Sequence, residues 1–188
     1  MKKLMGLLMV LIIASGIMYG QKPLTVGDKV PQFKATADDG SAWDISRNIG
    51  KDYIVIYFFP GAMTSGCTKQ ACSYRDHMAD LTSEDAIVVG ISGDKPESLK
   101  LFRHAENLNF PLLSDEKGTI AAAFGVPVGD GATIKRTIDG AEYELVRDLS
   151  IKRWTFIVGK DGKIIYKNDA VDPEQDTREV LDFLRAQK

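Results

Sequence analysis

Two apolar runs without polar alternation constrain the fold of this chain more than any other feature. They span residues 53–59 and residues 86–92, and each has the length of one β-strand. A strand with one face in water alternates apolar and polar residues, whereas a strand that is covered on both faces does not. Between the runs, residues 67–81 have a helical composition. The sequence therefore predicts a central sheet covered by helices, in the α/β class.

The remaining segments extend this pattern to the end of the chain. Turn signals and apolar spacing predict, in order, a hairpin around Asp38-Asp39-Gly40, a helix over 96–108, a short strand over 110–114, a helix over 118–124, a loop over 125–131, a second hairpin of 153–158 with 163–166, and a helix over 173–186. No repeat or long linker interrupts them. We therefore expect one thioredoxin-like domain over residues 21–188, with a mixed central β-sheet flanked by helices and an N-terminal β-hairpin.

Charge and residue counts limit the partners of this domain. The chain has 24 Lys and Arg against 26 Asp and Glu, and its formal net charge is -2. Such a balance gives no strong positive field for a polyphosphate backbone, so we expect no nucleic-acid binding. With 2 cysteines and 2 histidines, the chain is too poor in ligands for a disulfide framework or a full structural metal site. Chemistry based on one or two thiols remains open.

The first 20 residues have the pattern of a secretory signal peptide. Lys2 and Lys3 precede an uncharged stretch whose densest apolar part, residues 4–14, is shorter than the roughly 20 residues that a membrane-spanning helix needs. Small residues predict cleavage near residue 16 or residue 20. We therefore expect an exported protein, periplasmic or secreted, without stable membrane association after cleavage. An uncleaved N-terminal membrane anchor is the alternative.

The segment that contains both cysteines carries the candidate chemistry. Cys67 follows a loop that ends a strand, and it falls in the first turn of the predicted helix. Unpaired backbone N–H groups and the positive end of the helix dipole favour thiolate over thiol at such a position. Fast attack by such a thiolate also needs hydrogen-bond donors aimed at the substrate atoms onto which negative charge moves. The N–H groups of Gly66 and Cys67 and the Thr64 hydroxyl are the candidates.

The second cysteine, Cys72, follows Cys67 by five positions. In an intact helix this spacing places the two Cα atoms roughly 8.7 Å apart, beyond the roughly 7 Å limit for a disulfide. A bond between the two cysteines therefore requires the first turns of the helix to unwind.

The residues around Cys67 resemble a known family. Pro60, Thr64 and Cys67 match the P-x3-T-x2-C motif of the peroxiredoxins, and the stretch TSGCTKQAC is similar to the peroxiredoxin Q branch, also called bacterioferritin comigratory protein. Similar segments are VGDKVPQF at 26–33, SGDKPE at 92–97, LLSD at 112–115, RWTFIV at 153–158 and DGKI at 161–164, so that the resemblance covers about residues 24–186. Ser65 stands where many members have proline, and Gln70 where many have glutamate.

The resemblance implies a set of site residues. Thr64, Cys67 and Arg153 would form the peroxide site, and Pro60 and Gly66 would lie against the substrate. Because position 70 is an amide in this chain, the resemblance implies no carboxylate there.

The resemblance also implies a reaction. Cys67 would reduce hydrogen peroxide or an organic hydroperoxide and become a sulfenic acid, which Cys72 would resolve to an intramolecular disulfide. A thioredoxin-like dithiol protein would regenerate both thiols. No metal, haem or flavin cofactor is implied, and we expect a monomer.

Other interpretations of the same residues stay open. Cys67 and Cys72 can form a structural disulfide in an exported protein. With a histidine they can form a copper-handling site on a thioredoxin fold, although their spacing is not C-x3-C, and a disulfide-exchange module is possible although C-x-x-C is absent. Arg153 can be a solvated or paired surface charge. For His77 and His104 we expect surface or capping roles.

Overall fold

The computed structural model describes residues 22–187, so the expected signal peptide at 1–20 lies outside the described residues. The main sheet has seven strands in the order β2-β1-β5-β4-β3-β8-β9. These strands are β1 (Lys34–Ala37), β2 (Ala42–Asp44), β3 (Tyr53–Phe58), β4 (Ala86–Ser92), β5 (Leu112–Ser114), β8 (Trp154–Val158) and β9 (Ile164–Asn168). Strands β3, β4 and β5 are parallel to one another, and the other neighbouring pairs are antiparallel. The expected mixed sheet and N-terminal hairpin are confirmed.

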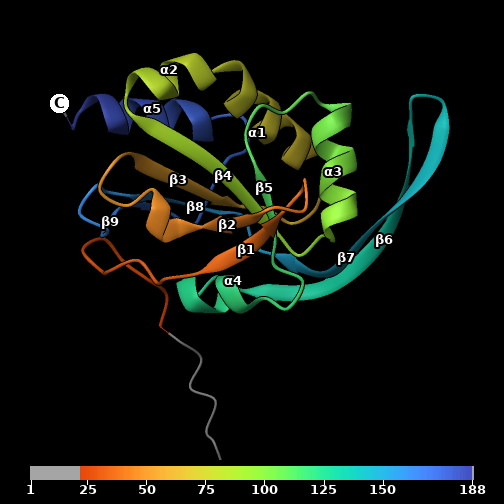
Figure 1. The fold of residues 1–188 in the computed structure, drawn as a ribbon, viewed down its shortest axis with the longest axis horizontal. Coiled ribbons are helices and arrows are strands. Elements are labelled where there is room, and N and C mark those ends of the chain that lie inside the picture. The colour runs from red at the N-terminus through yellow and green to blue at the C-terminus, as the bar shows by residue number, and fades with distance from the viewer. Residues whose placement is uncertain (1–21, 188) are drawn as a thin grey trace, which may run out of the picture.

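Helices cover both faces of this sheet (Figure 1). The helices are α1 (Ser65–Asp76), α2 (Met78–Ser83), α3 (Pro96–Ala105), α4 (Thr119–Phe124) and α5 (Asp176–Arg185), with a 3-10 turn, η1, at Ile45–Arg47. One core lies between the sheet and helices α1, α2, α3 and α5, and it contains Val55 and Tyr57 of β3. The other lies under α4 and η1 and contains Ile54 and Ile56. Both faces of β3 are therefore buried, which explains why its sequence does not alternate.

The helix expected over residues 67–81 begins earlier and is divided in two. α1 begins at Ser65, and the chain leaves the helical conformation at His77, between α1 and α2. The His77 ring Nδ1 lies 2.9 Å from the Ser73 carbonyl oxygen, the acceptor that the His77 backbone N–H also uses. His77 is the C-cap residue of α1, which confirms a capping role for this histidine.

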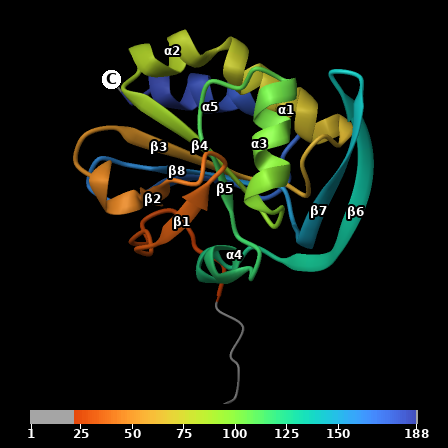
Figure 2. The same cartoon turned by 45° about the vertical axis from the view of Figure 1, so that its right-hand side comes forward.

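The expectation of a loop over residues 125–131 is wrong from Val128 onward. Strands β6 (Val128–Ile138) and β7 (Ala141–Ile151) form a separate antiparallel ribbon. Asp139 and Gly140 both have positive φ, as a two-residue hairpin turn requires. Most residues of β6 are exposed, so the strand carries little of the apolar alternation by which strands are recognised. The ribbon extends beyond the main sheet and passes beside α3 (Figures 1 and 2).

Over residues 22–187, no helix combines the length and the apolar composition that a membrane crossing demands.

Candidate active site

Cys67 lies in the first turn of α1, with its side chain 1% exposed. The helix follows directly on the loop that ends β3, and Thr64 occupies the N-cap position in an extended conformation. The first N–H groups of an α-helix have no partner within the helix. The backbone at the start of α1 therefore turns N–H groups toward the region in front of the Cys67 sulfur.

Arg153 approaches the same sulfur from the position just before β8. Its Nη2 donates a hydrogen bond to Cys67 Sγ at 3.2 Å, and its Nη1 donates to Gln70 Oε1 at 2.5 Å. A guanidinium group at this distance stabilises negative charge on the sulfur. Gly66 lies beside this guanidinium group, since a Cβ atom at that position would be in ordinary contact with Arg153 Nη2, at 3.4 Å. Arg153 is thus paired with the cysteine rather than a solvated surface charge.

The Thr64 hydroxyl is oriented differently from the sequence-based expectation. It donates a hydrogen bond to the Gly61 carbonyl oxygen at 2.9 Å, and it makes no side-chain capping bond to α1. Its proton is therefore engaged within the loop, and its free lone pair can accept a hydrogen bond. In this conformation the proton of the expected donor is occupied, and the hydroxyl oxygen is left as an acceptor.

The ribbon holds the loop that precedes α1. Ser150 Oγ donates to the Pro60 carbonyl oxygen at 3.1 Å, and Arg136 Nε donates to the Met63 carbonyl oxygen at 3.1 Å. Met63 has a φ of 54°, a left-handed conformation that is costly for a residue with a Cβ atom. The ribbon therefore stabilises a loop conformation that the loop sequence by itself disfavours.

A buried carboxylate holds the same loop from the other side. Asp94 Oδ2 accepts hydrogen bonds from the Ala62 N–H at 2.9 Å and from the Ser92 hydroxyl at 2.8 Å. Burial raises the pKa of the Asp94 carboxyl, although these hydrogen bonds and the charge of Arg147 act to lower it. Gly61 makes room for that arginine, because a Cβ atom there would lie 1.6 Å from Arg147 Nη1. Asp94 and Arg136 hydrogen-bond to the loop and Arg147 lies against Gly61, and none of the three was identified from the sequence as a site residue.

Gln70 links α1 to another buried carboxylate. The Gln70 side chain is fully buried, and its Nε2 donates to Asp176 Oδ2 at 2.6 Å. Asp176 was also missed by sequence analysis, because an acidic residue in the first turn of a helix is ordinary.

Cys72 lies in a different environment from Cys67. Its Sγ is a half-buried thiol that donates to Glu106 Oε2 at 3.5 Å. Burial raises the pKa of the Cys72 thiol; Arg75 acts to lower it, and Glu106 raises it further. Both cysteines are free, and α1 is helical through both positions. The alternative interpretation of Cys67 and Cys72 as a structural disulfide is therefore not supported, and the two thiols do not share a ligand site.

A cavity of about 480 Å³ opens beside Arg153. It lies between the loop, the base of the ribbon and the start of β8, and is lined by Pro60, Pro127, Val128, Gly129, Ser150, Ile151, Lys152 and Arg153. Most of this lining is apolar, so the cavity suits an apolar group that lies beside Arg153.

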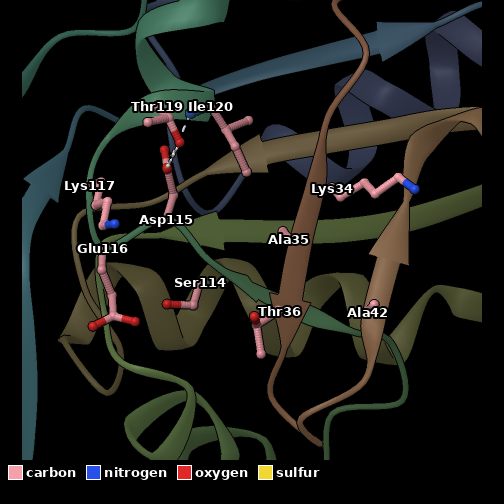
Figure 3. A pocket seen from close by; sticks show the side chains of 10 residues that line it. All are labelled: Lys34, Ala35, Thr36, Ala42, Ser114, Asp115, Glu116, Lys117, Thr119 and Ile120. Atoms are coloured by element: carbon pink, nitrogen blue, oxygen red, sulfur yellow. Dashed lines mark hydrogen bonds between the residues drawn. The ribbon is translucent and has the colours of Figure 1, made fainter.

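A second cavity, of about 470 Å³, lies at β1, β5 and α4, away from both cysteines (Figure 3). Asp115 points from its wall toward the start of α4, where it accepts from the N–H groups of Ile120 and Ala121 at 3.1 and 2.8 Å. Its oxygens are therefore used by the first turn of the helix, and none of the expected site residues lines this cavity.

The histidines take the expected surface and capping roles, since His104 Nε2 forms an exposed contact with Asp139 Oδ2 at 2.7 Å. Over residues 22–187, no group of three or more His, Cys, Asp or Glu side chains is arranged to hold a metal ion.

The chain is similar to proteins of one family. The profile of the AhpC/TSA family matches residues 26–167. Peroxiredoxin Bcp of Escherichia coli strain K12 is 38% identical over 163 residues, which cover 87% of this chain and 97% of that protein. Peroxiredoxin Bcp of Bacillus subtilis is 34% identical over 162 residues, which cover 86% of this chain and 96% of that protein. The crystal structure of peroxidoxin BcpB from Mycobacterium tuberculosis has a TM-score of 0.72 and 32% identity to this chain. The match covers 87% of this chain and 97% of that one. The expected thioredoxin-like fold is confirmed.

Proposed function

This chain belongs to the AhpC/TSA family and is a thiol-dependent peroxidase, and we propose that Cys67 is the thiol that reduces the peroxide. The hydrogen bond from Arg153 Nη2 to Cys67 Sγ carries this assignment. The start of the helix and the guanidinium group both place positive charge beside this sulfur, and the thiolate is the form of a cysteine that attacks. The family implies a peroxide substrate and a thioredoxin-like protein as reductant.

In the proposed first step, the Cys67 thiolate attacks one oxygen of the peroxide. A sulfur–oxygen bond forms as the O–O bond breaks, and the departing oxygen leaves as water or an alcohol after it takes up a proton. Arg153 and the N–H groups at the start of α1 stabilise the negative charge that moves onto the departing oxygen. The Thr64 oxygen accepts a hydrogen bond from the peroxide O–H and so orients the substrate.

In the proposed second step, Cys72 attacks the sulfur of the Cys67 sulfenic acid, and the sulfenic oxygen leaves as water. Because α1 holds the two cysteines too far apart for a bond, the first turns must open before this step. A dithiol protein then reduces the disulfide and becomes a disulfide itself. This cycle needs no metal or organic cofactor in the chain.

The substrates proposed are hydrogen peroxide and organic hydroperoxides. The cavity beside Arg153 supports the second class, because the side chains of Pro127, Val128 and Ile151 offer apolar surface next to the site. We also propose that the enzyme is exported and monomeric, with export resting on the pattern of residues 1–20. An exported enzyme needs a reductant in its own compartment.

The test is rapid mixing of the reduced protein with peroxide, with thiol loss and tryptophan fluorescence followed together. The wild type should lose both thiols for each peroxide that is reduced. Cys67→Ser should not react, whereas Cys72→Ser should react once and then stall or be overoxidised. If Cys72→Ser fails in the first reaction while Cys67→Ser retains it, the attacking and resolving thiols are reversed.

A further inference from the structure

Asp176 is a buried carboxylate on which two helices and a strand meet. It is fully buried at the start of α5, and its Oδ2 accepts hydrogen bonds from Gln70 Nε2 at 2.6 Å, Tyr74 Oη at 2.7 Å and Thr155 Oγ1 at 2.9 Å. Gln70 and Tyr74 belong to α1, and Thr155 belongs to β8. One oxygen atom therefore connects the helix of Cys67 with the strand that follows Arg153.

This oxygen determines which way the Gln70 amide faces. Because Oδ2 accepts three hydrogen bonds, it requires the NH₂ end of the amide, and the carbonyl end must point the other way. That carbonyl oxygen, Oε1, accepts the hydrogen bond from Arg153 Nη1, while Arg153 Nη2 donates to Cys67 Sγ. The reversed amide would set its NH₂ group against the guanidinium group, with no acceptor for either.

We propose that Asp176 is a positioning residue of the peroxide site, which acts through Gln70 to hold Arg153 against the Cys67 sulfur and also ties α1 to α5. This inference rests on the proposed role of Cys67. Asp176 touches neither the sulfur nor the cavity, so its effect on the reaction passes through the hydrogen-bonded side chains.

The two connections have opposite effects on the two chemical steps. The Gln70 connection keeps Arg153 in place and so speeds the attack on the peroxide. The Gln70 and Tyr74 bonds also hold α1 in its helical form, and both must break if the unwinding of the helix reaches these residues. Loss of the Asp176 acceptor should therefore slow attack on the peroxide and speed formation of the disulfide.

The first experiment compares Asp176→Ala with Asp176→Asn by rapid mixing with hydrogen peroxide. Asp176→Ala removes the acceptor, and the peroxide rate should fall about tenfold or more, the size of effect expected for a hydrogen bond to a charged group. The deficit should persist when the pH is raised into the alkaline range, because Arg153 is misplaced. Asp176→Asn should remain within a few-fold of wild type, since its amide oxygen can replace Oδ2 while its NH₂ group takes the place of Oδ1. In the wild type, Asp176 Oδ1 has no hydrogen-bond partner within the described residues.

Thr177→Val is the matched control. Thr177 is the next residue of α5, is equally buried, and has a hydroxyl without a hydrogen-bond partner over residues 22–187. Its replacement by a side chain of the same shape should leave both steps unchanged. An equal loss in Thr177→Val and Asp176→Ala would mean that any disturbance of α5 slows the enzyme, and the positioning role would be rejected.

A double-mutant cycle tests whether Asp176 acts through Gln70. Gln70→Leu should slow attack on the peroxide, and Asp176→Ala should cause no further loss in that background. Additive losses would contradict the proposed connection.

Tyr74→Phe tests the connection to α1 in a protein that keeps the carboxylate, and so remains informative if Asp176→Ala does not fold. It removes one hydrogen bond to Asp176, so the sulfenic acid should form the disulfide several-fold faster and less Cys67 should be overoxidised at a given peroxide dose. An unchanged or slower disulfide step would contradict this part of the inference.

The outcomes separate this inference from the proposed function. If the wild type consumes peroxide no faster than Cys67→Ser, the role of Cys67 fails and the inference fails with it. If the wild type reacts rapidly and Asp176→Ala reacts at the same rate, only the positioning role of Asp176 is wrong.

Discussion

The Thr64 hydroxyl donates its proton to the Gly61 carbonyl oxygen at 2.9 Å, within the loop that precedes α1. A hydroxyl has one proton and two lone pairs, so this contact leaves Thr64 as an acceptor toward the substrate. Arg153 and the backbone N–H groups supply donors at the same place. A hydroperoxide, which can both donate and accept, matches such a site.

Replacement of Thr64 by valine should slow the reaction with hydrogen peroxide about tenfold or more, because the variant keeps the shape of the side chain and loses the acceptor. Thr64→Ser should retain most of the rate, since its hydroxyl can make the same bond to Gly61. The second-order rate constant from rapid mixing distinguishes the two variants. Equal rates in Thr64→Val and wild type would show that the hydroxyl does not orient the peroxide.

Arg153→Met should reduce the rate of peroxide attack about a hundredfold, because the guanidinium group stabilises both the thiolate and the charge that moves onto the departing oxygen. The loss should remain at a pH high enough to ionise Cys67 fully. Arg153→Lys should recover only part of the rate, since one ammonium group cannot reproduce the planar contacts to Cys67 and Gln70. A full recovery of Arg153→Met at alkaline pH would restrict Arg153 to ionising the thiol.

Formation of the disulfide should unfold the first turns of α1 and leave the sheet intact. Hydrogen exchange of the oxidised protein should rise over residues 65–76, whereas β3 and β8 should stay protected because they are buried at the centre of the sheet. The reduced protein and the oxidised Cys72→Ser variant are the controls. If the disulfide-bonded protein shows the same protection over α1 as the reduced protein, the unwinding mechanism is wrong.

The negative charge of Glu106 should keep Cys72 protonated in the folded, reduced state. Burial is the main cause that raises the pKa of the Cys72 thiol, and Glu106 adds to it. Removal of that charge lowers the pKa, so at mildly alkaline pH a larger fraction of Cys72 is thiolate. In a Cys67→Ser background, Glu106→Gln should therefore increase the rate at which Cys72 is alkylated about threefold. A pKa lower by one full unit would increase this rate about tenfold.

The control for this experiment is Glu97→Gln, which removes an exposed carboxylate from the first turn of α3 and should leave alkylation of Cys72 unchanged. A slower reaction in Glu106→Gln would mean that the carboxylate helps to ionise the thiol, which is the opposite of the expected effect.

The ribbon of β6 and β7 shows where local sequence patterns were insufficient. The middle of β7 is held by contacts to distant segments, such as the hydrogen bond from the Lys95 N–H to the Val146 carbonyl oxygen. Because much of β6 faces water, its residues carry no apolar alternation from which a strand is recognised. The hydrogen bonds from Arg136 and Ser150 to the loop that precedes α1 could not be predicted, because the ribbon that carries these residues was not predicted.

The elements whose signals are local could be predicted from the amino-acid sequence alone. The apolar runs at 53–59 and 86–92 predicted β3 and β4, the hairpin turns predicted β1 with β2 and β8 with β9, and the chain after β3 placed Cys67 in the first turn of a helix. Each of these depends on side-chain periodicity or on turn residues within a few positions. Arg153 was identified only through resemblance to a family, since an arginine next to a strand has no local signature of a site.

Which distant groups meet at the sulfur depends on the three-dimensional packing of the elements. The pairing of β3 with β8 brings Arg153 to Cys67, and the packing of α5 on α1 brings Asp176 to Gln70. These partners are 86 and 106 positions apart in the chain. Their hydrogen bonds depend on strand register and helix packing to within a fraction of an ångström, and no periodicity in a single sequence encodes that geometry.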